Sequence, residues 1–192
     1  DGIGLGEVGI DYTRKGITTD ASMRTNVKSI YAIGDVTGNY MLAHVATKEA
    51  LVAVETIAGR SASIDYMLVP RCVYTNPEYA AVGRTEQEAR EQGYDVRVSR
   101  VRLGRIGRAL TMGETFGLAK MVIDNSTSQL LGLQILAPHA SEFITEATLA
   151  LQQEASLEAL ASAIHPHPTL SEIVWETAQS ALGKSIHGED TS

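Results

Sequence analysis

The sequence contains a single cysteine, Cys72, and this scarcity excludes several kinds of protein. One cysteine can form neither an internal disulfide nor a cysteine-rich metal site, and we expect no metal ligands. So low a cysteine content fits a reducing compartment, so we expect a cytoplasmic protein. We interpret Cys72 as a small buried strand residue, because no neighbouring residue would activate its thiol.

Long apolar runs and an excess of basic residues are also missing. No stretch approaches the roughly 18 to 20 apolar residues of a membrane-spanning helix. The formal net charge is −7, whereas nucleic-acid binding favours a basic surface. The chain opens without an initiator Met or a signal-peptide pattern, which suggests a fragment or a processed piece. With 44% hydrophobic and 20% charged residues, the composition is that of a globular protein with one or two cores.

Two regions follow one another along the chain. Residues 1–67 begin with glycine-rich loops, followed by a strand expected at Ser29–Ile33 and a helix expected at about Leu42–Ala58. Residues 60–65 are small and polar, as in a linker. Residues 68–186 form a second region, and we expect 187–192 to be a loose tail.

The second region predicts an α+β fold, an antiparallel sheet with helices on one face. We expect strands at Arg71–Tyr74, Tyr79–Gly83, Val96–Leu103, Phe116–Asp124 and Leu130–Leu136. We expect helices at 86–92, after a capping box of Thr85 and Glu88, and at Ala140–Gln153, Leu157–Ala161 and Glu172–Leu182. The apolar alternation switches between Val98 and Val101, which predicts a bulge near Ser99–Arg100.

Residues 4–9 match the pattern G-x-G-x-x-G of dinucleotide-binding loops. That use requires a strand before the glycines and a helix after them, so that the helix start faces the phosphate. No strand pattern precedes these glycines, and residues 10–16 have the composition of a turn. We therefore reject the phosphate-binding interpretation.

Residues 25–35 are more informative, because an apolar strand pattern runs directly into Gly34 and Asp35. Glycine lets a ligand approach the backbone closely. A carboxylate at the end of a strand can accept a hydrogen bond from a ribityl hydroxyl, and the amides of the next helix can face an electron-rich ring. Taken alone, an aspartate after a strand is more often a turn former or a helix cap, but the full pattern of residues 25–35 weakens that interpretation.

The segment from His165 to Glu172 carries the strongest chemical signal. An imidazole can take up and return a proton near neutral pH, and a carboxylate partner can orient it. Glu172 follows His167 by five residues, a spacing that lets the side chains meet if the turn is tight, and we expect a cis bond before Pro168. The alternatives are a polar loop that caps the last helix and, with His165, a zinc site.

Five arginines form a basic run within this acidic chain: Arg97, Arg100, Arg102, Arg105 and Arg108. Such a run is typical of a solvated strand edge, where charge discourages pairing with another sheet. The alternative is a docking patch for an acidic partner.

Several motifs together resemble those of the dihydrolipoamide dehydrogenases, within the flavin-dependent pyridine nucleotide–disulfide oxidoreductases. The resemblance runs from about Gly2 to Leu182 and rests on residues 23–27, 31–38, 41–44, 73–78 and 167–172. It implies a C-terminal strip of a Rossmann-like FAD-binding domain, residues 1–67, followed by a dimer-interface domain, residues 68–186.

The resemblance also implies roles for individual residues. His167 would be the general base and Glu172 its partner, reaching into the other subunit of a homodimer, with His165 as a neighbour. Asp35 would bind the flavin ribityl chain. The flavin ring would be lined by Met41, Leu42, Ala43 and His44.

The implied activity is oxidation of dihydrolipoamide to lipoamide, with electrons passing through a redox disulfide and FAD to NAD. Implied partners are a second copy of the chain and the lipoyl groups of acyltransferases in 2-oxoacid dehydrogenase-type complexes, with neither nucleic acid nor membrane. The FAD phosphate loop, the redox cysteines and the NAD domain of relatives have no counterpart here, so we expect the isolated chain to be inactive and to bind FAD weakly. Two alternatives remain, a glutathione- or mercuric-reductase-like enzyme and a non-catalytic dimerisation or docking module.

Overall fold

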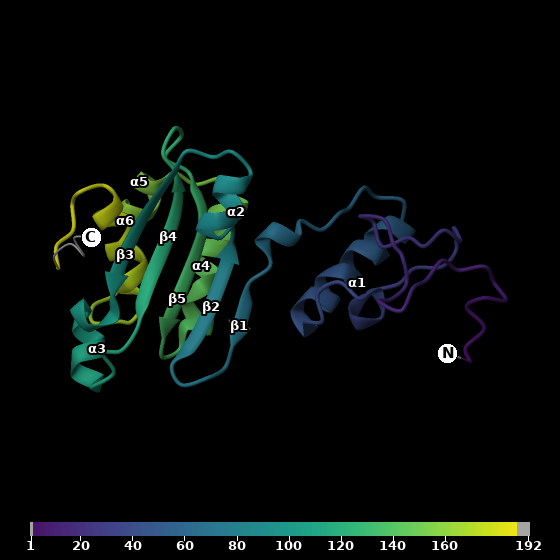
Figure 1. The fold of residues 1–192 in the computed structure, drawn as a ribbon, viewed down its shortest axis with the longest axis horizontal. Helices are drawn as coiled ribbons and strands as arrows, with labels where there is room; N and C mark the ends of the chain where they lie inside the picture. Colours follow the sequence, from purple (N-terminus) through teal and green to yellow (C-terminus); the bar gives the residue numbers. More distant parts are fainter. Residues whose placement is uncertain (1, 188–192) are drawn as a thin grey trace. The chain divides into compact units, whose positions relative to one another are not determined.

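The structure is a computed structural model that describes residues 2–187. The chain divides into two compact units, Asp1–Tyr66 and Met67–Ser192, which are described separately below (Figure 1). All but the first residue of the expected loose tail, 187–192, lies outside the described residues.

The first unit consists largely of loops packed around one long helix. A 3-10 turn, η1 at Gly34–Thr37, precedes α1 at Ala43–Ile57, and a second turn, η2 at Tyr66–Leu68, lies at the unit's end. The helix lies within a residue of its predicted bounds. Small apolar clusters replace a single core: one contains Ile10, Ile17 and Ala32, and another contains Met23, Val52 and Ala53.

The strand expected at Ser29–Ile33 does not form. Only Tyr31 makes an isolated antiparallel bridge, to Arg24. The backbone groups are satisfied locally instead, because the amide of Ala32 donates to the carbonyl of Met23. A strand needs to pair with a neighbouring strand over several residues. Here the pairing is limited to the single bridge between Arg24 and Tyr31. The glycines at 4–9 lie in turns without a following helix, in agreement with the rejected phosphate-binding interpretation.

The second unit is built on a five-stranded antiparallel sheet in the order β1-β2-β5-β4-β3 (Figure 1). The strands are β1 Arg71–Val73, β2 Glu78–Gly83, β3 Val96–Arg102, β4 Leu118–Asp124 and β5 Leu130–Ala137. All five predicted strands are present, with ends that differ by at most two residues.

The helices lie mainly on one face of this sheet, which confirms the predicted fold class (Figure 1). They are α2 Glu86–Glu91, α3 Gly107–Met112, α4 Ala140–Gln152, α5 Leu157–Ser162 and α6 Glu172–Ala181, with a 3-10 turn η3 at Leu103–Arg105. The capping box of Thr85 and Glu88 starts α2 as predicted. That short helix packs on the opposite face, where Ala89 meets Val122 and Leu131. Helix α3 was not predicted.

The core lies between the sheet and helices α4 and α6. Helix α4 packs on β2 and β5, and α6 packs on β3 and β4. Fully buried apolar residues from the strands, among them Met121 and Leu133, meet Ile144 of α4 and Ile173 of α6. Burial of such side chains stabilises a fold by roughly 1.5 to 3 kcal/mol each. The core packing therefore fixes the positions of both helices. Helix α4 carries Glu146 and α6 begins with Glu172, two residues described in the next subsection.

The predicted bulge near Ser99–Arg100 is absent, because β3 and β4 pair in continuous register from Val96 with Asp124 to Arg102 with Leu118. The register shift lies between Val122 and Ile123, where β4 pairs with β5. The alternation of apolar residues in β3 gave a false signal because a polar residue, Ser99, occupies an inward-facing position. Ser99 is buried, and its hydroxyl donates to the carbonyl of Thr177 in α6 at 2.9 Å.

Candidate functional site

The loop between α5 and α6 carries both histidines of the predicted motif. A cis bond joins His167 to Pro168, as predicted. The hydroxyl of Thr169 donates to the carbonyl of Pro166 at 2.8 Å, which closes a tight turn just before α6. The turn brings His167 back toward the first residue of that helix.

His167 and Glu172 form a hydrogen-bonded pair. Nδ1 of His167 lies 2.8 Å from Oε1 of Glu172, and Oε2 of Glu172 accepts from the backbone amide of Thr169 at 2.7 Å. The side chain of Glu172 is 10% exposed, whereas that of His167 is 70% exposed. The carboxylate is thus fixed within the fold, and it holds an imidazole whose other edge faces solvent.

The surroundings of Glu172 favour its charged form. Burial acts to raise the pKa of this carboxyl, but the bonds from the Thr169 amide and the His167 ring prevail and lower it. The negative charge of Glu172 therefore persists at neutral pH, and the nearby His187 acts in the same direction as these two bonds. A carboxylate on Nδ1 orients the ring and stabilises an imidazolium, so the pair can accept a proton at Nε2.

His165 has a glutamate partner of its own. Its Nε2 lies 3.0 and 3.1 Å from the two carboxylate oxygens of Glu146 in α4, and its Nδ1 lies 3.3 Å from the carbonyl of Ala163. The loop itself offers His165 no partner, since the residue five positions on, Leu170, is a buried core residue. Glu146 was missed because it precedes His165 by 19 residues, and no local pattern links the two.

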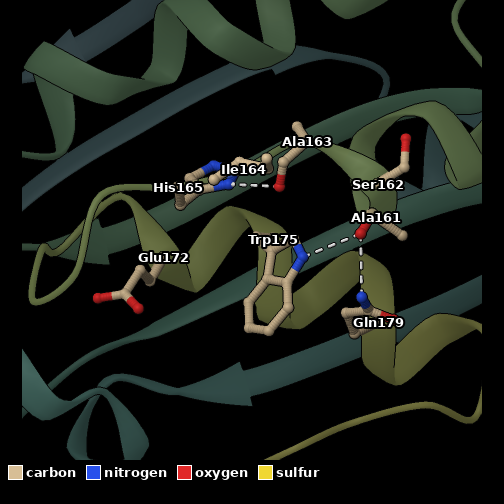
Figure 2. A pocket seen from close by; sticks show the side chains of 8 residues that line it. All are labelled: Ala161, Ser162, Ala163, Ile164, His165, Glu172, Trp175 and Gln179. Atoms are coloured by element: carbon tan, nitrogen blue, oxygen red, sulfur yellow. Dashed lines mark hydrogen bonds between the residues drawn. The ribbon is translucent and has the colours of Figure 1, made fainter.

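A pocket of about 360 Å³ lies beside the loop, and Glu172 forms part of its wall. Figure 2 shows that its other walls are residues 161–165 and two side chains of α6, Trp175 and Gln179. Both of these side chains donate to the carbonyl of Ala161 at 2.9 Å. These bonds join the end of α5 to α6 and frame the loop that bears the histidines.

The zinc alternative finds no support in residues 2–187, where no group of three potential ligands could hold a metal ion. His165 and His167 instead contact different glutamates. Cys72 is half-buried in β1 rather than fully buried, and burial, followed by the charge of Glu78, raises the pKa of its thiol. A raised thiol pKa argues against a reactive thiolate.

The residues assigned to the flavin lie in η1, directly before α1 and in the first turn of α1. Asp35 is exposed within η1, which packs on α1. The N-cap residue of this 15-residue helix, Leu42, makes no side-chain cap hydrogen bond, so it does not itself satisfy the positive end of the helix. Leu42 is half-buried there, and the remaining residues are exposed, namely Met41, Ala43 and His44.

A buried carboxylate missed by the sequence analysis holds this segment in place. Glu49 of α1 is fully buried and accepts from the amide of Gly34 and from the hydroxyl of Tyr66, each at 2.6 Å. Burial, followed by the bond to Glu49, raises the pKa of Tyr66 to about 12. Gly34 has a positive φ of 70° and packs so near Ala46 that a Cβ atom would lie 3.1 Å from that side chain.

These features fit one part of a bound flavin. The segment offers both kinds of hydrogen-bonding group beside the positive-φ turn at Gly34. The exposed carboxylate of Asp35 is an acceptor, and the backbone amides at the start of α1 are donors. Exposed apolar side chains on the same segment, Val36 and Met41, could pack against a ring. Asp35, the α1 amides and these side chains are thus able to hold a ribityl chain and one edge of a ring system.

The arginine run lies along the edge strand β3 and the turn and helix that follow. Arg97 donates to the carbonyl of Ala181, Arg105 donates to that of His187, and Arg100 pairs with Glu86 at 3.3 Å. These contacts within the unit and the edge position favour the charged-edge interpretation over a docking patch. None of the helices described in residues 2–187 combines the length and the apolar composition that a membrane span requires.

Comparison with known protein families matches both units. Residues 69–178 match the model described as pyridine nucleotide-disulphide oxidoreductase, dimerisation domain, and residues 3–50 match the model described as pyridine nucleotide-disulphide oxidoreductase. Among curated proteins, a dihydrolipoyl dehydrogenase of Thermus scotoductus is 47% identical over 97% of this chain, and one of Chlamydia muridarum is 43% identical over the same share. The chain spans 41% and 40% of the length of these relatives.

Solved structures give the same picture. LpdA from Mycobacterium tuberculosis superposes with a TM-score of 0.88 at 32% identity, over 93% of this chain and 39% of its own. The HOCl-induced flavoprotein disulfide reductase RclA from Escherichia coli gives a TM-score of 0.83 at 27% identity, over 91% of this chain and 41% of its own.

Proposed function

The chain belongs to the pyridine nucleotide-disulphide oxidoreductases, and we propose that it is the C-terminal portion of a dihydrolipoyl dehydrogenase. The observation that carries this proposal is the 2.8 Å contact of His167 with Glu172, set in a domain of the family's dimerisation type. The relatives named dihydrolipoyl dehydrogenase at 43% to 47% identity support this activity over that of a glutathione- or mercuric-type reductase.

The reaction we propose is the oxidation of dihydrolipoamide by an enzyme disulfide outside this chain. His167 takes a proton from one substrate thiol, and the thiolate attacks the disulfide to form a mixed disulfide and release an enzyme thiolate. The imidazolium of His167 passes its proton to the released enzyme thiolate and then takes the proton of the second substrate thiol. The resulting thiolate attacks the substrate sulfur of the mixed disulfide, which closes the lipoamide ring, releases the second enzyme sulfur as a thiolate and leaves both electrons on the enzyme's two sulfurs. Bound FAD supplies the route by which this electron pair leaves for NAD.

Within this scheme Glu172 orients His167 and stabilises the imidazolium formed when the ring accepts a proton. The buried position of Glu172 and its bond from the Thr169 amide suit that role, because the carboxylate then needs no reorganisation during proton transfer. The exposure of His167 suits a base that serves the active site of the other subunit in a homodimer.

The remaining assignments follow from the same proposal. Asp35 would bind the ribityl chain of FAD, and residues 41–44 would lie against the flavin ring. The phosphate and adenine contacts would come from outside the chain, so we propose that the 192 residues alone hold FAD weakly and are inactive. The full enzyme would act on lipoyl groups of acyltransferases in 2-oxoacid dehydrogenase-type complexes, in the cytoplasm.

A substrate comparison with the full-length enzyme tests the proposal. We expect rapid reduction of NAD with dihydrolipoamide as the electron donor, and little oxidation of a reduced nicotinamide with glutathione disulfide or mercuric ion as the acceptor. Preference for either of these acceptors would assign the chain to a sister reductase. Absence of all three activities from a flavin-loaded homodimer would favour the non-catalytic docking alternative.

A further inference from the structure

Two histidines of one short loop each meet a glutamate from a different helix. His167 meets Glu172 at the start of α6, and His165 meets Glu146 within α4. Both helices pack on the same face of the sheet and share its core. The loop is therefore bound by its two histidines to two helices that are packed into the core. The second pair has no part in the proton transfer proposed above, although it lies only two residues from the proposed base.

The contacts of His165 are those of an anchor. Its side chain is only 9% exposed, and its Nε2 approaches both oxygens of Glu146, at 3.0 and 3.1 Å. Its Nδ1 faces the carbonyl of Ala163, as Figure 2 shows. A carboxylate accepts, so the ring donates from Nε2 in the contact with Glu146. Hydrogen bonds to a charged carboxylate in a sheltered position are stronger than those between neutral groups.

A continuous series of bonds links this anchor to the pair at His167. Residue 166 follows His165 directly, and its carbonyl accepts from the hydroxyl of Thr169 at 2.8 Å. The amide of Thr169 donates in turn to Glu172 at 2.7 Å, and Glu172 holds the ring of His167. A shift of His165 would therefore move the carbonyl of Pro166 that fixes Thr169. It would thereby weaken the bonds of Thr169 and His167 to Glu172.

We propose that His165 and Glu146 are positioning residues that hold the loop so that Thr169 and His167 both reach Glu172. The pair itself touches no substrate. Its value for the reaction rests on the proposed function, because the placement of His167 matters to catalysis only if that ring is the base.

Hydrogen exchange at the amide of Thr169 tests this proposal in the 192-residue chain without flavin or substrate. In His165→Ala we expect exchange about tenfold faster, since a hydrogen bond to a charged group is lost from the anchor. Glu146→Gln should give a smaller increase, because the glutamine side chain keeps one acceptor oxygen. The matched control is Glu142→Gln, on an exposed residue one turn earlier in α4, and it should leave the rate unchanged.

The amide of Leu133 in the centre of β5 reports on global stability in the same samples. Exchange at Thr169 that is equal in His165→Ala and in the Glu142→Gln control would overturn the proposal. A rise matched by Leu133 would overturn it too, because the pair would then serve only general stability. Neither result depends on turnover, so a failure of the full-length enzyme to oxidise dihydrolipoamide would refute the proposed function and leave this result unchanged.

Discussion

The Nδ1 atom of His167 lies 2.8 Å from Oε1 of Glu172, although the first side chain is 70% exposed and the second only 10%. This contrast separates two tasks. The carboxylate is held by the fold, through the amide of Thr169, and the imidazole extends from it to where a substrate can reach. Gly107, at the start of α3, lies beside the ring, where a Cβ atom would be 3.7 Å from Cε1 of His167.

The lowered pKa of Glu172 predicts a pH-dependent contribution to stability. A carboxyl whose folded-state pKa lies below its ordinary value of 4.5 stabilises the fold above that pH, and this stabilisation is lost as the pH falls through the folded-state pKa. Glu172→Gln should therefore lower the free energy of unfolding by roughly 1 to 3 kcal/mol at pH 7. The difference from the unmodified chain should shrink below pH 4.5.

Urea unfolding of the two chains at neutral and acidic pH measures this difference, and Glu142→Gln serves as the control for loss of an exposed charge on the same unit. A difference that is the same at both pH values would show that the carboxylate is not selectively stabilised in the folded chain.

The pair of Glu49 and Tyr66 gives a prediction at alkaline pH. Because the pKa of Tyr66 is raised to about 12 from an ordinary value of 10, the protonated phenol stabilises the fold fully below pH 10. This stabilisation is lost as the pH rises toward about 12. In Glu49→Gln we expect Tyr66 to ionise at lower pH, because the bond to a charged carboxylate disappears.

Ultraviolet absorbance of tyrosinate during an alkaline titration follows this ionisation, with Tyr66→Phe as the variant that identifies its contribution. An unchanged late phase in Glu49→Gln would mean that burial alone sets the pKa of Tyr66.

The dimerisation-domain match predicts that purified chains pair with two-fold symmetry. Ile164 is 98% exposed beside the pocket at α6, and we expect a second subunit to cover it. Ile164→Glu should then raise the dissociation constant about tenfold or more, since a charge would be buried at the interface. Ile3→Glu changes an exposed isoleucine outside the dimerisation-domain match, residues 69–178, and is the control.

Analytical ultracentrifugation at micromolar concentrations measures this association. A monomer for the unmodified chain, or equal dissociation constants for the two variants, would contradict the predicted interface.

The sequence predicted the sheet well because local patterns determine it. Alternating apolar residues located the five strands, and the capping box located the start of α2. The five-residue spacing of His167 and Glu172 could be interpreted for the same reason, since one short turn decides whether the two side chains meet.

The errors arose where a distant residue decides the outcome. Ser99 occupies an inward position because Thr177 offers it a carbonyl 78 residues later, and this contact gave a false signal of a bulge. The strand expected at Ser29–Ile33 lacks a neighbouring strand. Glu146 and Glu49 contact residues 15 to 19 positions away, so neither the second histidine–glutamate pair nor the support of Gly34 could be predicted from local spacing.

We propose His167 as the base and Glu172 as its partner. The most direct test is stopped-flow reduction of the full-length enzyme by dihydrolipoamide, in variants at both residues and at His165. We expect His167→Ala to slow this half-reaction by roughly 10² to 10⁴. Glu172→Gln should slow it less, because the base remains, and His165→Ala should have a still smaller effect through the position of the loop. A nearly normal rate in His167→Ala together with a crippled His165→Ala would contradict the account.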